Sequence, residues 1–83
     1  MEYNYSTSGV CSTKISFKIE GNTVSDVNFV GGCNGNLKAV SSLTDGLTVE
    51  QIESKCGGIT CGYRKTSCPD QLAKAVRQAY DKQ

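Results

Sequence analysis

The chain has 83 residues, with nine basic and eight acidic side chains, a formal net charge of +1, five cysteines and no histidine. A chain of this length forms one domain, residues 1–83, whose core is too small to enclose a large organic cofactor. The near-neutral charge, without runs of like charge, argues against a nucleic-acid partner. The N-terminus is polar and no apolar segment could span a membrane, so we expect a cytoplasmic protein without a membrane partner.

The first half of the chain shows the alternation of apolar and polar side chains that is typical of strands. Residues 14–20 alternate in this way, a Gly-Asn turn follows at residues 21–22, and apolar side chains resume through Val30. Tyr3 and Tyr5 indicate a further strand before this hairpin. The pattern predicts antiparallel strands with one face on a core.

After the hairpin the apolar spacing becomes helical. Leu37, Val40 and Leu43 recur at helical intervals, which predicts a helix that begins at Cys33 or just after it. The Asp-Gly pair at residues 45–46 ends this segment.

Two more helices are predicted in the second half. Thr48 and Gln51 form a capping box that opens a short helix, closed by Cys56 and the glycine after it. Pro69 stands in the first turn of the last helix. The apolar face of that helix comprises Leu72, Ala73, Val76, Ala79 and Tyr80. The fold class is therefore α+β, with a small antiparallel sheet of about three N-terminal strands covered on one face by about three helices.

The cysteines all lie near predicted element ends. They are Cys11, Cys33, Cys56, Cys61 and Cys68. In a reducing compartment this density indicates metal binding or redox chemistry more than structural disulfides. Cys33 and Cys68 stand at predicted helix starts, where backbone amides and the helix dipole favour a thiolate. Without histidine, a metal must be bound mainly by sulfur, although cysteine also packs as a small buried apolar residue.

Residues 66–70 read Thr-Ser-Cys-Pro-Asp and, with Gly-Gly-Cys at residues 31–33 and Cys-Gly at residues 61–62, resemble the TSCPD domain family over nearly the whole chain. That family occurs as short stand-alone proteins and as the C-terminal domain of adenosylcobalamin-dependent ribonucleotide reductases. The resemblance implies a link to ribonucleoside-diphosphate reduction and deoxynucleotide supply. The thioredoxin-dependent radical reaction needs a large barrel that this chain cannot form, so we expect an accessory protein whose partner is a ribonucleotide reductase or thioredoxin.

A second resemblance concerns the layout of three cysteines. Cys11 before the hairpin, and Cys33 and Cys68 at helix starts, resemble the arrangement in IscU and NifU-type iron-sulfur scaffolds. Thr13 and Ser67 stand where that family has an acidic residue and a histidine. The resemblance implies an IscU-like layout in which a fourth ligand comes from elsewhere in the chain.

We interpret the cysteines as a closed site of four thiolates for zinc, bound by Cys11, Cys33, Cys61 and Cys68, with Cys56 as the alternative ligand. Iron or an iron-sulfur cluster is the alternative cofactor, because both metals accept tetrahedral sulfur. The competing hypothesis is a redox pair, in which Cys56 and Cys61 form a disulfide that relays electrons from thioredoxin to a reductase.

Overall fold

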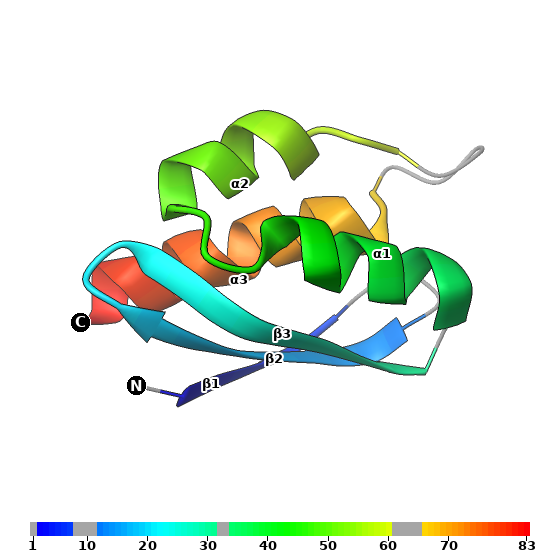
Figure 1. Cartoon of the computed structure of the whole chain (residues 1–83), viewed down its shortest axis with the longest axis horizontal. Helices are drawn as coiled ribbons and strands as arrows, with labels where there is room; N and C mark the ends of the chain where they lie inside the picture. Colours follow the sequence, from blue (N-terminus) through cyan, green and yellow to red (C-terminus); the bar gives the residue numbers. More distant parts are fainter. Residues whose placement is uncertain (1, 8–11, 32–33, 61–65) are drawn as a thin grey trace.

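The computed structural model describes residues 2–7, 12–31, 34–60 and 66–83 of the chain. Three strands are followed by three helices (Figure 1). They are β1(Glu2–Ser6), β2(Ser12–Glu20), β3(Thr23–Gly31), α1(Asn34–Thr44), α2(Val49–Cys56) and α3(Cys68–Lys82). This order confirms the α+β class expected from the sequence.

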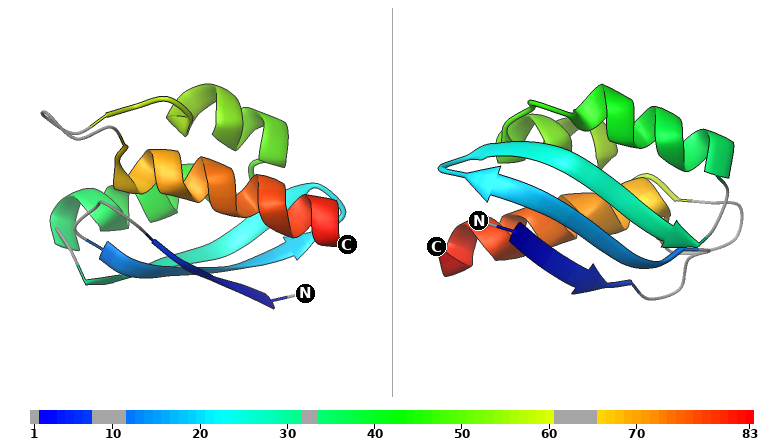
Figure 2. Two further views of the ribbon diagram at one scale, coloured as in Figure 1. Left: turned by 180° about the vertical axis from the view of Figure 1, so that it is seen from behind. Right: turned by 60° about the horizontal axis from the view of Figure 1, so that its bottom comes forward.

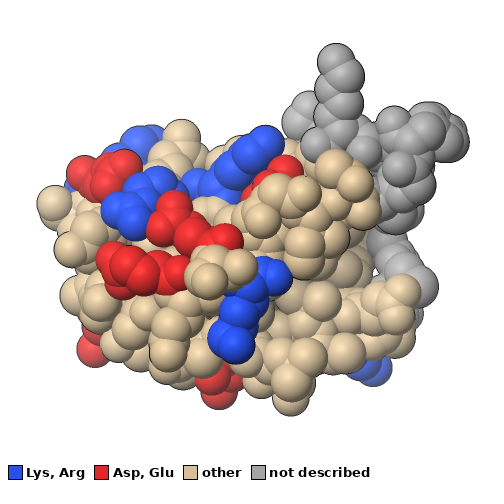
Figure 3. Space-filling model, turned by 90° about the horizontal axis from the view of Figure 1, so that it is seen from above, with Lys and Arg blue, Asp and Glu red and all other residues tan. Residues whose placement is uncertain are grey.

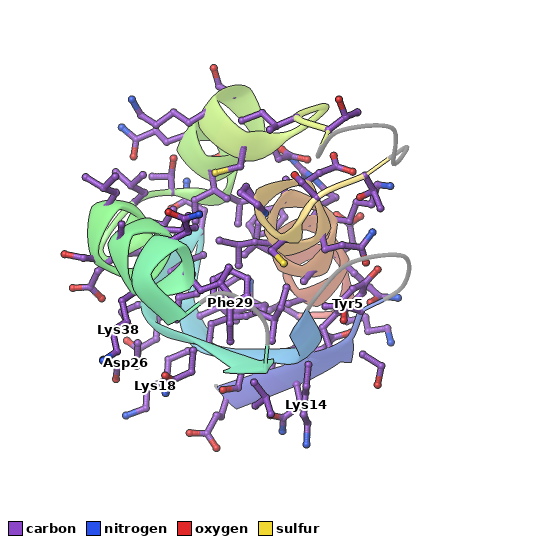
Figure 4. All side chains as sticks on the ribbon, turned by 90° about the vertical axis from the view of Figure 1, so that its right-hand side faces the viewer. Tyr5, Lys14, Lys18, Asp26, Phe29 and Lys38 are labelled. Carbon is purple, nitrogen blue, oxygen red and sulfur yellow. The ribbon has the colours of Figure 1, made fainter. Side chains whose placement is uncertain are left out.

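The strands form one antiparallel sheet in the order β1-β2-β3. Alternation along β2 places Ile15, Phe17 and Ile19, each at most 1% exposed, on one face of the sheet. Figure 4 shows Phe29 on this same face and Lys14 pointing away from it. One face of the sheet therefore meets the core and the other meets solvent.

The hairpin between β2 and β3 contains a tight turn and register shifts in its pairing. Gly21 turns the chain with a φ of 59°, a left-handed conformation that glycine adopts without steric cost. The pairing of β2 with β3 shifts register between Ser16 and Lys18. On β3, opposite this shift, Asp26 has a φ of 53°. Lys18 lies 3.4 Å from the Asp26 carboxylate, so the bulge carries an exposed ion pair on the solvent face.

All three helices lie on the apolar side of the sheet, with α1 and α3 next to it and α2 further out, above α3 (Figures 1 and 2). α1 packs on β3, whereas α3 packs on β2 and on α2. The shared core contains Ile15, Phe17, Ile19, Val24, Val27, Val49, Ile52, Cys56, Leu72, Ala73, Ala75, Val76 and Ala79. Because full burial of an aliphatic side chain contributes about 1.5–3 kcal/mol, this cluster is the main source of stability.

The helix predicted from Leu37, Val40 and Leu43 is confirmed as α1, but its apolar side chains are not equally buried. Leu37 is buried, whereas Leu43 is 77% exposed. At 3.6 residues per turn, Leu43 lies about 120° around the helix from Leu37, outside the face that contacts β3. Tyr80 on α3 is also partly exposed.

The connection between α1 and α2 bonds to the outer edge of β3. The Val24 N–H donates to the Leu47 carbonyl at 2.8 Å, and the Gly46 N–H donates to the Val24 carbonyl at 2.7 Å. The Val49 N–H donates to the Asn22 carbonyl at 2.8 Å. This edge of the sheet is therefore partly covered by the chain itself.

The predicted capping box at the start of α2 is confirmed. The Gln51 N–H donates to Thr48 Oγ1 at 3.1 Å, and the Thr48 N–H donates to Gln51 Oε1 at 2.9 Å. No helix in residues 34–60 or 66–83 is both long and apolar enough to cross a membrane.

Candidate functional site

The start of β2, the end of β3 and the starts of α1 and α3 all lie at one end of the molecule (Figures 1 and 2). Of the four predicted zinc ligands, Cys68 lies at this end. Cys11, Cys33 and Cys61 lie outside the described residues. Within the described ranges, no three His, Cys, Asp or Glu side chains gather as a metal site. The four-thiolate set therefore stays a prediction.

Cys68 is the first residue of α3, as the sequence predicts, and its side chain is half-buried. Ser67 is the N-cap in an extended conformation, and its Oγ accepts a hydrogen bond from the Asp70 N–H at 3.2 Å. Pro69 follows in the first turn, where its missing N–H costs no helical hydrogen bond. The local sequence thus fixes Cys68 at a helix start.

The Asp70 carboxylate links this helix start to the turn after α2. Its Oδ1 accepts from the Gly58 N–H at 2.7 Å, and its Oδ2 accepts from the Thr66 hydroxyl at 2.5 Å. Lys74 lies 3.3 Å from Oδ2. The hydrogen bonds from Thr66 and Gly58, with a smaller contribution from Lys74, lower the pKa of Asp70 against the opposing effect of burial. The carboxylate is therefore a buried, charged acceptor.

Two further side chains extend these contacts. Ser67 Oγ donates to the Ile59 carbonyl at 2.6 Å, and Gln71 Nε2 donates to Thr66 Oγ1 at 3.0 Å. We call the set Gly58, Ile59, Thr66, Ser67, Asp70 and Gln71 the Asp70 network. Three of the five residues of the Thr-Ser-Cys-Pro-Asp motif, Thr66, Ser67 and Asp70, therefore stabilise the N-terminus of α3 through hydrogen bonds within the chain.

Sequence reasoning missed the Asp70 network, although one signal for it was present. Ser67 and Asp70 have the spacing of a Ser/Thr-x-x-Asp/Glu helix start, which precedes the apolar run of the last helix. The bond from Gly58 to Asp70 had no such signal, because it joins residues twelve positions apart.

Cys56 has surroundings unlike those of a helix start. It is the last residue of α2, it is 7% exposed, and burial raises the pKa of its thiol although nearby Lys55 opposes the change. It lines a mainly apolar hollow with Val40, Leu43, Thr44, Leu47, Lys55, Ile59 and Pro69. A buried thiol in such surroundings stays protonated and packs as an apolar side chain.

A larger, open groove of about 570 Å³ runs between α2 and α3. Its lining comprises Glu53, Gly57, Asp70, Ala73, Lys74, Arg77, Gln78 and Asp81. Arg77 binds Glu53 through two hydrogen bonds of 2.6 and 3.0 Å and lies 3.6 Å from Asp81. Charges of both signs stand side by side over this face (Figure 3). With three acidic and two basic side chains in its lining, the groove lacks the strong field of one sign that would attract a charged ligand.

These features define a small α+β domain in which a five-residue motif fastens the start of the last helix and presents a cysteine there. The family model of the TSCPD domain matches residues 1–80, and the chain belongs to the TSCPD domain family. No curated protein and no solved structure matches the chain.

Proposed function

We propose that this TSCPD domain binds one zinc ion through the thiolates of Cys11, Cys33, Cys61 and Cys68. The observation that carries the proposal is the position of Cys68, the first residue of a helix whose start is fastened by the Asp70 network. A fixed backbone and a half-buried sulfur suit a structural metal ligand, because little conformational freedom is lost when the metal binds.

The described neighbours of two other predicted ligands support the same site. Cys11 immediately precedes β2 and Cys33 immediately precedes α1, and both of these elements start at the end of the molecule where α3 starts (Figures 1 and 2). Ser12, the first residue of β2, pairs with Gly31, the last residue of β3. The described residues next to these two predicted ligands therefore lie at the end of the molecule where α3 begins.

The burial of Cys56 favours Cys61 as the fourth ligand. A zinc ligand must be deprotonated, whereas the pKa of the Cys56 thiol is raised by its burial. The same burial disfavours the redox relay, because a disulfide between Cys56 and Cys61 would need a thiol that solvent and thioredoxin can reach. Four thiolates without an open position give a closed tetrahedral site, which stabilises a fold and performs no reaction.

The test is elemental analysis of protein purified without added metal, combined with titration of thiols before and after chelation. We expect one zinc per chain and about four thiols that react only after chelation. Cys68→Ser should lose the zinc, and Cys56→Ala, the matched control, should keep it. Iron in place of zinc would indicate the iron-sulfur alternative. Absence of metal, with two thiols lost on mild oxidation, would overturn the proposal in favour of the redox pair.

We also propose that the zinc-loaded domain acts as an accessory to a ribonucleotide reductase. This rests on membership of the TSCPD family, because the resemblance to that family implies a link to ribonucleoside-diphosphate reduction. In a test with an adenosylcobalamin-dependent reductase deprived of its own TSCPD domain, the added chain should bind the enzyme and raise its thioredoxin-dependent turnover. The Cys68→Ser variant should not. A chain that neither binds nor changes turnover would refute this role and leave the zinc site untouched.

A further inference from the structure

The two outer edges of the sheet differ in how they are covered. On β3, backbone groups of Val24 bond to Gly46 and Leu47, and the Asp26 N–H donates to Asp45 Oδ1 at 3.0 Å. On β1, no strand other than β2 pairs within the described residues. The right-hand view of Figure 2 shows β1 as the outermost described element on its side of the sheet.

The sequence of β1 also lacks the proline, lysine and bulge that often protect an edge strand, although the strand is short and begins with Glu2. Residues 2–6 contain no proline, no lysine and no glycine, and their pairing with β2 runs without a register shift. Edge strands that avoid pairing generally carry such residues or bulges, because an open edge offers its N–H and C=O groups to another strand. Within residues 2–7, 12–31, 34–60 and 66–83, the β1 edge is thus open and regular.

The side chains of β1 are symmetrical about Asn4. Tyr3 and Tyr5 flank it on the helix side of the sheet, where both rings are half-buried against the core. Glu2 and Ser6 lie further out and, with Asn4, are exposed on the opposite face. An antiparallel pair of β1 strands with its two-fold axis at Asn4 would place each Tyr3 opposite a Tyr5 and each Glu2 opposite a Ser6.

This register brings favourable pairs together without like charges. Directly opposed aromatic side chains stabilise antiparallel strands, and here each ring would cover the exposed part of the other. The Tyr3 ring is already positioned, because its hydroxyl donates to Gln78 Oε1 at 2.9 Å and its centroid lies 5.6 Å from that of Phe17.

We propose that two copies of this chain associate through β1, in antiparallel register centred on Asn4, to form a continuous six-stranded sheet. The interface is of the isologous type, in which the same strand serves both partners. A pairing of five residues buries little surface, so the dimer is weak and concentration-dependent. The inference does not depend on the zinc site.

The test is sedimentation velocity of the full chain from roughly 10 µM to about 1 mM, the range that suits a weak interface. Wild-type protein should shift from monomer to dimer. Asn4→Lys places two lysines opposite each other at the axis and Asn4→Glu two glutamates, and each should weaken dimerisation about fivefold. An equimolar mixture of the two variants should restore a dimer, because the axis then carries opposite charges.

A matched control is available on the same row of the sheet. Asn4 and Asn28 both pair with Ser16 on β2, and Asn28 is likewise exposed. Asn28→Lys and Asn28→Glu should leave dimerisation unchanged. If Asn4→Lys fails to fold, Asn4→Glu still tests the proposal. It should fold because the new carboxylate would lie diagonally opposite Lys14 and Lys18 on β2, which carry the opposite charge. A monomer at every concentration, or equal weakening by the Asn4 and Asn28 variants, would overturn the proposal.

Discussion

The carboxylate of Asp70 on α3 accepts a 2.7 Å hydrogen bond from the backbone N–H of Gly58, just after α2. The Asp70 side chain is only 9% exposed, so water screens this charge-assisted bond little. The bond joins the start of the last helix to the end of the preceding one. The motif at residues 66–70 therefore stabilises the packing of α3 against α2 and also contains Cys68.

Loss of the Asp70 carboxylate should destabilise the domain. Asp70→Ala leaves the Gly58 N–H and the Thr66 hydroxyl without this acceptor, and we expect the free energy of unfolding to fall by about 2–3 kcal/mol. Urea denaturation followed by circular dichroism measures the change. Asp81→Ala on the same helix removes an exposed carboxylate and should cost less than about 0.5 kcal/mol. Equal losses in the two variants would contradict the importance of the Asp70 network.

The ion pair between Glu53 and Arg77 should contribute a pH-dependent part of the stability. The two hydrogen bonds from Arg77 lower the pKa of Glu53 in the folded chain. A carboxyl group with a lowered folded pKa stabilises the fold above its unfolded pKa, about 4.3, and this stabilisation is lost as the pH falls through the folded pKa. Arg77→Gln should therefore flatten the fall in stability below about pH 4.3. Identical slopes for wild type and variant in urea titrations would show that the pair contributes nothing.

Gly57 should not accept a side chain. A Cβ at this position would lie 2.6 Å from the Glu53 carbonyl oxygen, a backbone atom that cannot move without disturbing α2. Gly57→Ala should lower the free energy of unfolding by about 1–3 kcal/mol. A Cβ added to Gly35 in α1 would have no neighbouring atom within 4 Å, so Gly35→Ala should be neutral or stabilising by about 0.5 kcal/mol. Thermal unfolding of both variants checks this contrast, and a tolerated Gly57→Ala would disprove the close contact.

Cys56 should react slowly in the native protein. Its burial raises the pKa of the thiol and limits access, so iodoacetamide at neutral pH should modify it only when the chain unfolds. Mass spectrometry of peptides after native and denatured labelling gives the two rates. Modification of native Cys56 as fast as that of a small-molecule thiol would mean that α2 does not bury it.

Several features of the fold follow from local patterns. The alternation in β2, the Thr48 capping box and the apolar face of α3 each involve neighbours within a few positions, and the structure confirms all three. The exposure of Leu43 was not predictable in this way. Which part of an apolar stripe is buried depends on the angle at which α1 crosses β3, and the spacing of residues within one helix does not specify that angle.

The features of the candidate site also fall into those predicted from local sequence and those that depend on tertiary packing. Residue type and short spacing were enough to predict the helix start at Cys68, and the absence of histidine leads to the prediction that a metal would be bound mainly by sulfur. Tertiary packing was needed to bring Asp70 to Gly58, to bury Cys56 and to cover the β3 edge with the α1–α2 connection, while within the described residues β1 pairs with β2 alone. Those contacts join residues distant in the sequence, and they form only when the helices pack together on one face of the sheet.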